Sequence, residues 1–163
     1  MRSVVLVVAF VLAVPLAVHA ADDWAPLSFL IGDWGDCTGS GAPGASTGRF
    51  SVEPQVGGHA LLRRNTADTP QGRHEDLMMI FRTPGQGFRA VYVDNEDHVI
   101  QYTVTPTADP AGAVFLSDEA PGMPRFRLTY QMKPDARIGV VFAIAPPGGN
   151  DFKTYTEGSC KKR

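Results

Sequence analysis

Three histidines, His59, His74 and His98, are the side chains best suited to acid–base or metal chemistry in the body of this sequence. Metal sites place their ligands in short recurring spacings, commonly about two to five residues apart. Here the histidines are separated by 15 and 24 residues, and His74 precedes Glu75 and Asp76 where the third and fourth expected strands meet. Single histidines near strand ends are usually solvated, so the sequence predicts neither a metal site nor a catalytic histidine.

Two sequence patterns that are associated with enzymes do not support phosphate binding or catalysis here. Residues 39–44 read G-x-G-x-x-G, but that motif cradles phosphate only between a strand and a following helix, and Pro43 opposes the helix. A flexible hairpin loop within residues 39–48 is expected instead. Asp94 and Glu96 lie in a predicted tight turn, where carboxylates serve backbone geometry. With no G-x-S-x-G elbow for a serine hydrolase, we expect a protein that is not an enzyme.

The N-terminus has the pattern of a cleavable secretory signal peptide over residues 1–20. Arg2 supplies the positive charge, residues 4–18 form an apolar core, and Ala20 ends a cleavage site of small or medium-sized residues. The apolar run is shorter than the roughly 20 residues that a membrane-spanning helix needs. We therefore expect an exported protein, periplasmic or secreted, with a mature domain at 21–163 and no membrane span.

Cleavage would remove 20 of the 163 residues and leave 143, with 14 basic and 17 acidic side chains and a net charge of −3. That length suits one domain with its own hydrophobic core. The only basic cluster is residues 161–163, which does not form the extended cationic surface of a nucleic-acid-binding protein. The sequence leaves the oligomeric state open.

Cys37 and Cys160 are the only cysteines, 123 residues apart. Export to an oxidising compartment favours their pairing in a disulfide. The alternatives are a pair of metal ligands or a catalytic thiol, but neither cysteine has a histidine or second cysteine at ligand spacing.

Strand-sized runs dominate the chain after a short helical turn near residues 24–31. β-Branched and aromatic residues crowd into short segments bounded by Pro, Gly, Asp and Asn, which is typical of strands and tight turns. The expected strands are 33–38, 47–55, 60–67, 75–82, 88–93, 99–104, 113–118, 126–132, 138–144 and 152–161. This all-β pattern predicts an antiparallel up-and-down barrel of about ten strands; an open two-sheet sandwich is the alternative.

Alternation along the expected strands assigns side chains to the barrel interior. The predicted ligand-binding residues are Tyr92, Tyr102, Phe126, Leu128 and Tyr130. Arg63 and Arg64 are adjacent, so one of them should also face inward. An inward arginine beside these tyrosines suggests a clamp for a carboxylate, as in fatty-acid-binding barrels.

The segment Ile31-Gly32-Asp33-Trp34 resembles the Gly-x-Trp signature of lipocalin-like barrels. Gly32 would let the chain bend into the first strand, and Trp34 would plug one end of the barrel. Together with residues 57–62, residues 92–94 and Tyr155, the chain is similar in layout to nitrobindin, among exported bacterial calycin-type barrels. Nitrobindin-type barrels hold haem through a late histidine, whereas residues 150–163 contain none, so no cofactor is expected.

These observations favour a non-catalytic protein that binds a small hydrophobic or amphipathic molecule inside the barrel. The first alternative is a structural or interaction protein of the cell envelope with a filled barrel. A haem-binding barrel or an enzyme of unknown chemistry comes third. Because many functions share the barrel fold, the ligand-binding expectation rests on analogy.

Overall fold

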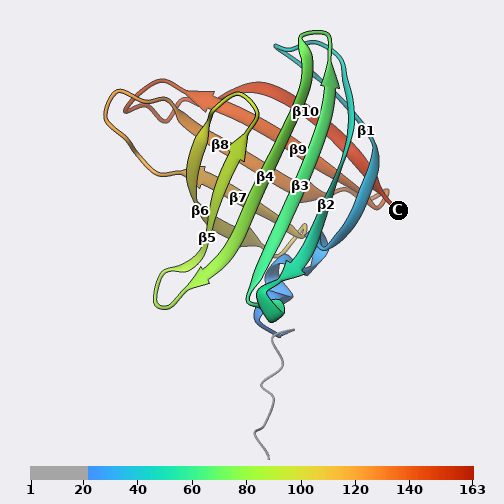
Figure 1. Ribbon diagram of the computed structural model, residues 1–163, viewed down its shortest axis with the longest axis vertical. Helices are drawn as coiled ribbons and strands as arrows, with labels where there is room; N and C mark the ends of the chain where they lie inside the picture. Colours follow the sequence, from blue (N-terminus) through green and yellow to red (C-terminus); the bar gives the residue numbers. More distant parts are fainter. Residues whose placement is uncertain (1–21) are drawn as a thin grey trace, which may run out of the picture.

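Residues 22–163, described by a computed structural model, form a closed ten-stranded antiparallel β-barrel (Figure 1). The strands follow chain order around the barrel and β1 pairs with β10, which closes it. The predicted signal peptide at 1–20 lies outside the described residues. The strands are β1 (Gly32–Gly41), β2 (Ser46–Gln55), β3 (Ala60–Thr69), β4 (Gly72–Thr83), β5 (Gly87–Asp94), β6 (Val99–Thr107), β7 (Gly112–Ser117), β8 (Arg125–Met132), β9 (Arg137–Ala145) and β10 (Lys153–Lys162).

The predicted fold is confirmed, including all ten strands and the choice of barrel over sandwich. One boundary was wrong, because the hairpin loop predicted within residues 39–48 is shorter. β1 continues to Gly41 and β2 begins at Ser46, and Gly39 pairs with both Ser46 and Gly158. Pairing on both sides thus holds glycine-rich sequence in a strand that its low intrinsic strand preference would not predict.

The junction of β1 and β10 carries the predicted disulfide between Cys37 and Cys160. It lies at an irregularity of the ladder, where the register of β1 shifts between Gly35 and Thr38. Both cysteines belong to the interior: Cys160 is buried in the core and Cys37 packs against it. The disulfide therefore covalently joins the first and last strands from inside the barrel.

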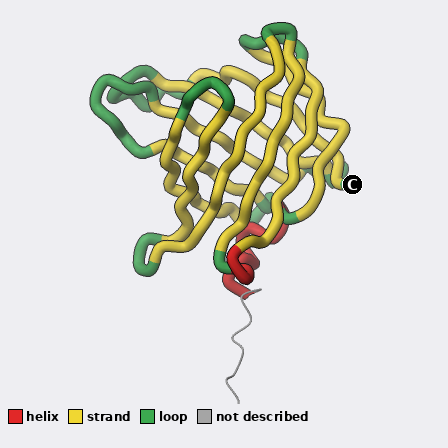
Figure 2. The backbone as a smooth tube through the Cα atoms, viewed as in Figure 1, coloured by secondary structure: helices red, strands yellow, loops and turns green. Residues whose placement is uncertain are grey.

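One end of the barrel is closed by the N-terminal 3-10 helix η1 (Asp22–Leu30) and the short η2 (Val56–Gly58), the red segments of Figure 2. The indole nitrogen of Trp24 donates to the Gly58 carbonyl at 2.7 Å, which ties η1 to η2. Leu27 and Leu30 of η1 are fully buried. None of the helices between Asp22 and Arg163 has the length and apolar character to cross a membrane.

The Gly-x-Trp segment lies at this closed end. Trp34 is 1% exposed, stacks on Phe50 with ring centroids 5.8 Å apart, and donates from its indole nitrogen to the Leu30 carbonyl at 2.9 Å. Gly32 has a φ of +122°, which side chains rarely tolerate, and it turns the chain from η1 into β1. Trp34 thus occupies the closed end of the barrel, as expected from its sequence context.

We predict that replacing both cysteines, Cys37→Ser with Cys160→Ser, keeps the strand-rich circular dichroism spectrum but destabilises the barrel. The disulfide closes a long loop, which on the chain-entropy model contributes up to about 5 kcal/mol to the free energy of unfolding. Urea titration of both proteins, with and without dithiothreitol, measures the difference. Reductant should lower the midpoint of the wild type and leave the double variant unchanged; equal midpoints for the two proteins in the absence of reductant would contradict the prediction.

Candidate functional site

The half of the barrel away from η1 encloses a cavity of about 790 Å³. Turn residues Pro43, Gln71 and Asn95 stand at its rim. Tyr102 and Leu128 line it, whereas Tyr130, two residues along β8 from Leu128 and nearer the closed end, does not. The plug formed by η1 and Trp34 fills one end of the barrel, so the open space lies toward the other.

Four of the five predicted ligand-binding residues line this cavity: Tyr92, Tyr102, Phe126 and Leu128. The fifth, Tyr130, faces inward but lies beneath the cavity floor. Its ring packs between Phe50 and Phe115, with both centroid distances 5.7 Å. Alternation correctly identified the inward faces, but it carries no information on depth along the barrel axis. Ligand binding by these residues remains a prediction.

One wall of the cavity is apolar and is built from β8 and β9. The rings of Phe126 and Phe142 are stacked, with centroids 5.8 Å apart and planes 11° apart. Tyr155 of β10 meets Phe142 edge-on at 6.2 Å. Leu128 and Ile144 extend the same surface. This wall offers a ligand aromatic and aliphatic contacts.

The opposite wall is polar and begins with a buried ion pair between Arg63 of β3 and Asp76 of β4. Only 7% of the Arg63 side chain and 3% of the Asp76 side chain are exposed. The second carboxylate oxygen of Asp76 accepts a hydrogen bond of 2.8 Å from the Asn65 amide. Burial of two charges is tolerated because each neutralises the other and further hydrogen bonds satisfy the carboxylate.

His74 of β4 extends this network toward the rim. Its Nε2 lies 3.1 Å from the Tyr92 hydroxyl and 3.3 Å from Asp76, and its Nδ1 lies 3.2 Å from Glu96. The Tyr92 hydroxyl in turn donates to Asp94 at 3.0 Å. Both nitrogens of the imidazole therefore contact carboxylates, an arrangement that suits a protonated ring.

These contacts set the charges on the polar wall. Burial alone would lower the pKa of Arg63 and raise that of Asp76, but their mutual attraction raises the first and lowers the second. The hydrogen bond to Asp76 raises the pKa of His74 to about 8 against the effect of burial, with help from Glu96. Burial raises the pKa of Tyr92. At neutral pH the wall thus holds the cations of Arg63 and His74, the three acidic side chains of Asp76, Asp94 and Glu96, and a neutral phenol.

The polar network was largely missed from the sequence. His74 was expected to be a solvated histidine near a turn, and this was wrong: it is a strand residue whose ring enters the barrel mouth, with 27% of its side chain exposed. The missing signal was alternation along β4, which places His74, Asp76 and Met78 on one face. The turn role predicted for Asp94 is confirmed, because Oδ1 accepts backbone N–H groups of Glu96 and His98.

One of the adjacent residues Arg63 and Arg64 was expected to face inward, and that residue is Arg63. Arg64 points outward and lies 3.5 Å from Glu53. The structure does not leave Arg63 free as a clamp for a ligand carboxylate, because its guanidinium is paired with Asp76. The sequence could not show this partner, since Asp76 is 13 residues away and meets Arg63 only across the β3–β4 ladder.

A third stretch of the cavity wall carries almost no side chains. Gly39, Gly48 and Gly158 line it from β1, β2 and β10. A Cβ on Gly48 would lie 2.3 Å from the Thr66 carbonyl oxygen, and one on Gly158 would lie 2.5 Å from that of Thr38. Glycine is therefore required by close approach of neighbouring strands, and the bare backbone leaves the cavity wide on this side.

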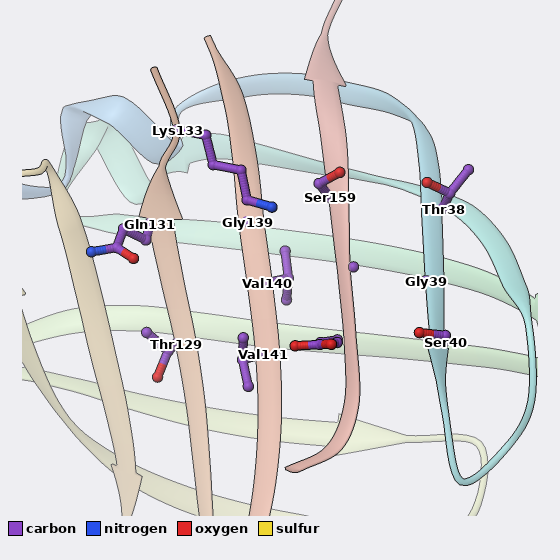
Figure 3. Close-up of a pocket in the computed structure, with 12 residues that line it drawn as sticks. Thr38, Gly39, Ser40, Thr129, Gln131, Lys133, Gly139, Val140, Val141 and Ser159 are labelled. Atoms are coloured by element: carbon purple, nitrogen blue, oxygen red, sulfur yellow. The ribbon is translucent and has the colours of Figure 1, made fainter. Parts of the chain in front are cut away.

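A second hollow, of about 480 Å³, lies outside the barrel over β1, β8, β9 and β10. Gly139 is among the residues that line it, and Figure 3 shows Lys133 reaching over this glycine while Ser159 and Thr38 lie beyond it. A Cβ on Gly139 would approach the Lys133 Cε to 2.8 Å. It is lined by hydroxyl, amide and charged side chains together with Val140 and Val141, and it lacks the aromatic rings of the interior cavity.

Within residues 22–163, no three or more His, Cys, Asp or Glu side chains are grouped so as to hold a metal ion. Tyr155 in the last strand packs edge-on against Phe142. Its position is that of a packing residue of the apolar wall.

No protein family model and no curated protein matches this chain. Among solved structures it is similar to a de novo designed fluorescence-activating β-barrel, with a TM-score of 0.44 and 14% sequence identity over 83% of this chain and 94% of the design. At that identity and TM-score the likeness carries no information about a ligand. The lipocalin-like and nitrobindin-like relationship remains an expectation from the sequence.

We predict that the His74 ring titrates near pH 8, as its carboxylate contacts require. Because this pKa lies above that of an unfolded histidine, about 6.5, protonated His74 stabilises the fold fully below that pH, and the contribution disappears as pH rises through 8. NMR titration of the histidine rings measures the pKa, and Glu96→Gln should lower it. In urea titrations, His74→Asn should destabilise most in mildly acidic buffer and least in alkaline buffer. A difference that does not depend on pH would contradict this assignment; His59→Asn, at the opposite end, is the control.

Proposed function

We propose that this protein is an exported, non-catalytic binding protein that accepts a small hydrophobic or amphipathic molecule in its barrel. The observation that carries the proposal is the cavity of about 790 Å³ with an apolar wall facing a polar one. Sites for small molecules are typically concave, of this size, and mainly apolar with a few placed polar groups. The rim turns leave a direct path from solvent to the cavity.

The hydrogen bonding of the polar wall supports a binding role over a catalytic one. A general base needs a free lone pair within reach of the substrate, but both nitrogens of His74 contact carboxylates. Asp76 already accepts from Arg63 and Asn65. His74 and Asp76 thus already have hydrogen-bond partners within the wall, which supports their role as a fixed surface.

Export is supported by two features at different places in the chain. Residues 1–20 carry the charge, apolar core and cleavage pattern of a signal peptide. The Cys37–Cys160 disulfide belongs to oxidising compartments such as the periplasm or the extracellular space.

A second candidate, an interaction protein of the cell envelope, is favoured by an apolar patch on the outer face of β4, β5 and β6. Leu77 is paired with Val93, and Val93 with Val99, and these side chains are 45%, 39% and 70% exposed. Neighbouring exposed apolar side chains of this kind often mark contact surfaces. The interior cavity, however, does not agree with the filled barrel that this candidate assumed.

The binding proposal is tested with N-phenyl-1-naphthylamine, an uncharged dye that fluoresces in apolar surroundings. Its fluorescence should rise on addition of the protein. Leu128→Trp, which projects an indole into the cavity, should weaken binding by at least about tenfold, because loss of the space removes the buried contact area. Thr129→Trp, one residue along and pointing outward, should bind as the wild type. Absence of a signal, or equal loss in both variants, would remove the cavity as the site and leave the outer patch as the functional surface.

A further inference from the structure

The two contrasting walls of the cavity face each other directly across the barrel. In the closed ring of strands, β4 and β9 are five strands apart in either direction, so they lie on opposite sides of the lumen. A ligand between them meets apolar side chains on one flank and charged or hydroxylated side chains on the other. This differs from a cavity whose polar groups gather at one end, which suits a linear amphiphile with its head at that end.

The apolar flank suits a ring better than a flexible chain. Phe126 and Phe142 form a stacked pair with planes 11° apart, and Tyr155 meets Phe142 edge-on. Such an array offers a third ring further stacked or edge-to-face contacts. An acyl chain would gain only area burial from the same surface, and would lose rotational freedom on binding.

Among the described residues, the two cations that the polar flank brings into the lumen, Arg63 and His74, are each paired with a carboxylate. A ligand carboxylate that approached Arg63 would come beside Asp76, which is paired with that guanidinium. The other cation of the wall, His74, lies between Asp76 and Glu96, and Asp94 stands next to Tyr92. Repulsion between carboxylates in a partly desolvated site therefore opposes anionic ligands.

An uncharged oxygen faces no such repulsion. Arg63 lines the cavity, and 7% of its side chain is exposed. A hydroxyl or carbonyl oxygen of a ligand can accept a hydrogen bond from the exposed part of this guanidinium without displacing Asp76. Hydrogen bonds to a charged donor are stronger than those between neutral groups, so Arg63 can hold the polar edge of an uncharged ligand.

We propose that the cavity is selective for uncharged ring compounds with a hydroxyl or carbonyl on one edge. The ring lies against Phe126 and Phe142, the polar edge points across the lumen to Arg63, and fatty acids and other carboxylates are rejected. This inference rests on the proposed binding function and narrows it to one class of ligand.

Competition against N-phenyl-1-naphthylamine tests the selectivity at neutral pH. There are three competitors. The first, 2-naphthol, is uncharged; the second, 2-naphthoate, has the same rings with a carboxylate; the third, dodecanoate, is a linear carboxylate. We expect 2-naphthol to displace the dye at a concentration at least about tenfold lower than either carboxylate. Displacement by a carboxylate as good as that by 2-naphthol overturns the inference but leaves the binding function standing. Failure of the dye itself to bind removes both.

Two substitutions with the same change in charge locate the cause of the selectivity. Asp76→Asn removes the carboxylate beside Arg63, so affinity for 2-naphthoate should rise at least about tenfold, with affinity for 2-naphthol little changed. Asp97→Asn, in the exposed β5–β6 turn, should change neither. An Asp76→Asn protein that folds, by circular dichroism, without this selective gain would contradict the role given to Asp76.

A second pair of variants tests the aromatic flank independently of the buried ion pair. Phe142→Leu should weaken 2-naphthol binding several-fold, and Val141→Leu, whose side chain points out of the barrel, should not. Equal affinities in the two variants would show that the stacked rings do not receive the ligand. This comparison retains its value if Asp76→Asn does not fold.

Discussion

Closure of β1 onto β10 is the constraint from which the other features of this molecule follow. The backbone ladder and the Cys37–Cys160 disulfide both hold that junction. An open sheet of ten strands would expose two edges and one apolar face. Closure leaves no edge, and every second side chain then points into the lumen of the barrel. Closure also places β4 opposite β9, and so makes the polar and apolar walls face each other.

The plug at one end determines where the lumen remains open. Trp34, Leu27 and Leu30 are at most 1% exposed and fill the end next to η1. The large side chains above them, including Phe115 and Tyr130, complete a packed lower half. Toward the other end, Gly39, Gly48 and Gly158 bring no side chains into the lumen, so the space there is too wide for the remaining residues to fill. The cavity is thus a consequence of uneven side-chain volume along one barrel.

Partial burial explains why charged groups inside the mouth are paired. Arg63 and Asp76 have almost no contact with solvent. An unpaired charge in such a position would cost so much free energy that the group would become neutral or the site would unfold. The same pairing limits what the site can do. A guanidinium held by one carboxylate is a poor receptor for a second, so the network that stabilises these charges supports the proposed preference of the cavity for uncharged molecules.

The amino-acid sequence by itself determined the class of fold, the ten strands, the disulfide and the inward faces of β5, β6 and β8, because strand-length apolar runs, turn residues and period-two alternation are local properties of the chain. It also required that Arg63 or Arg64 point inward. Only the tertiary structure decided that Arg63 meets Asp76, that His74 enters the mouth, and that Tyr130 lies below the cavity floor. Those outcomes depend on register between strands and on depth along the barrel axis, which arise from pairing of segments distant in sequence and leave no local pattern.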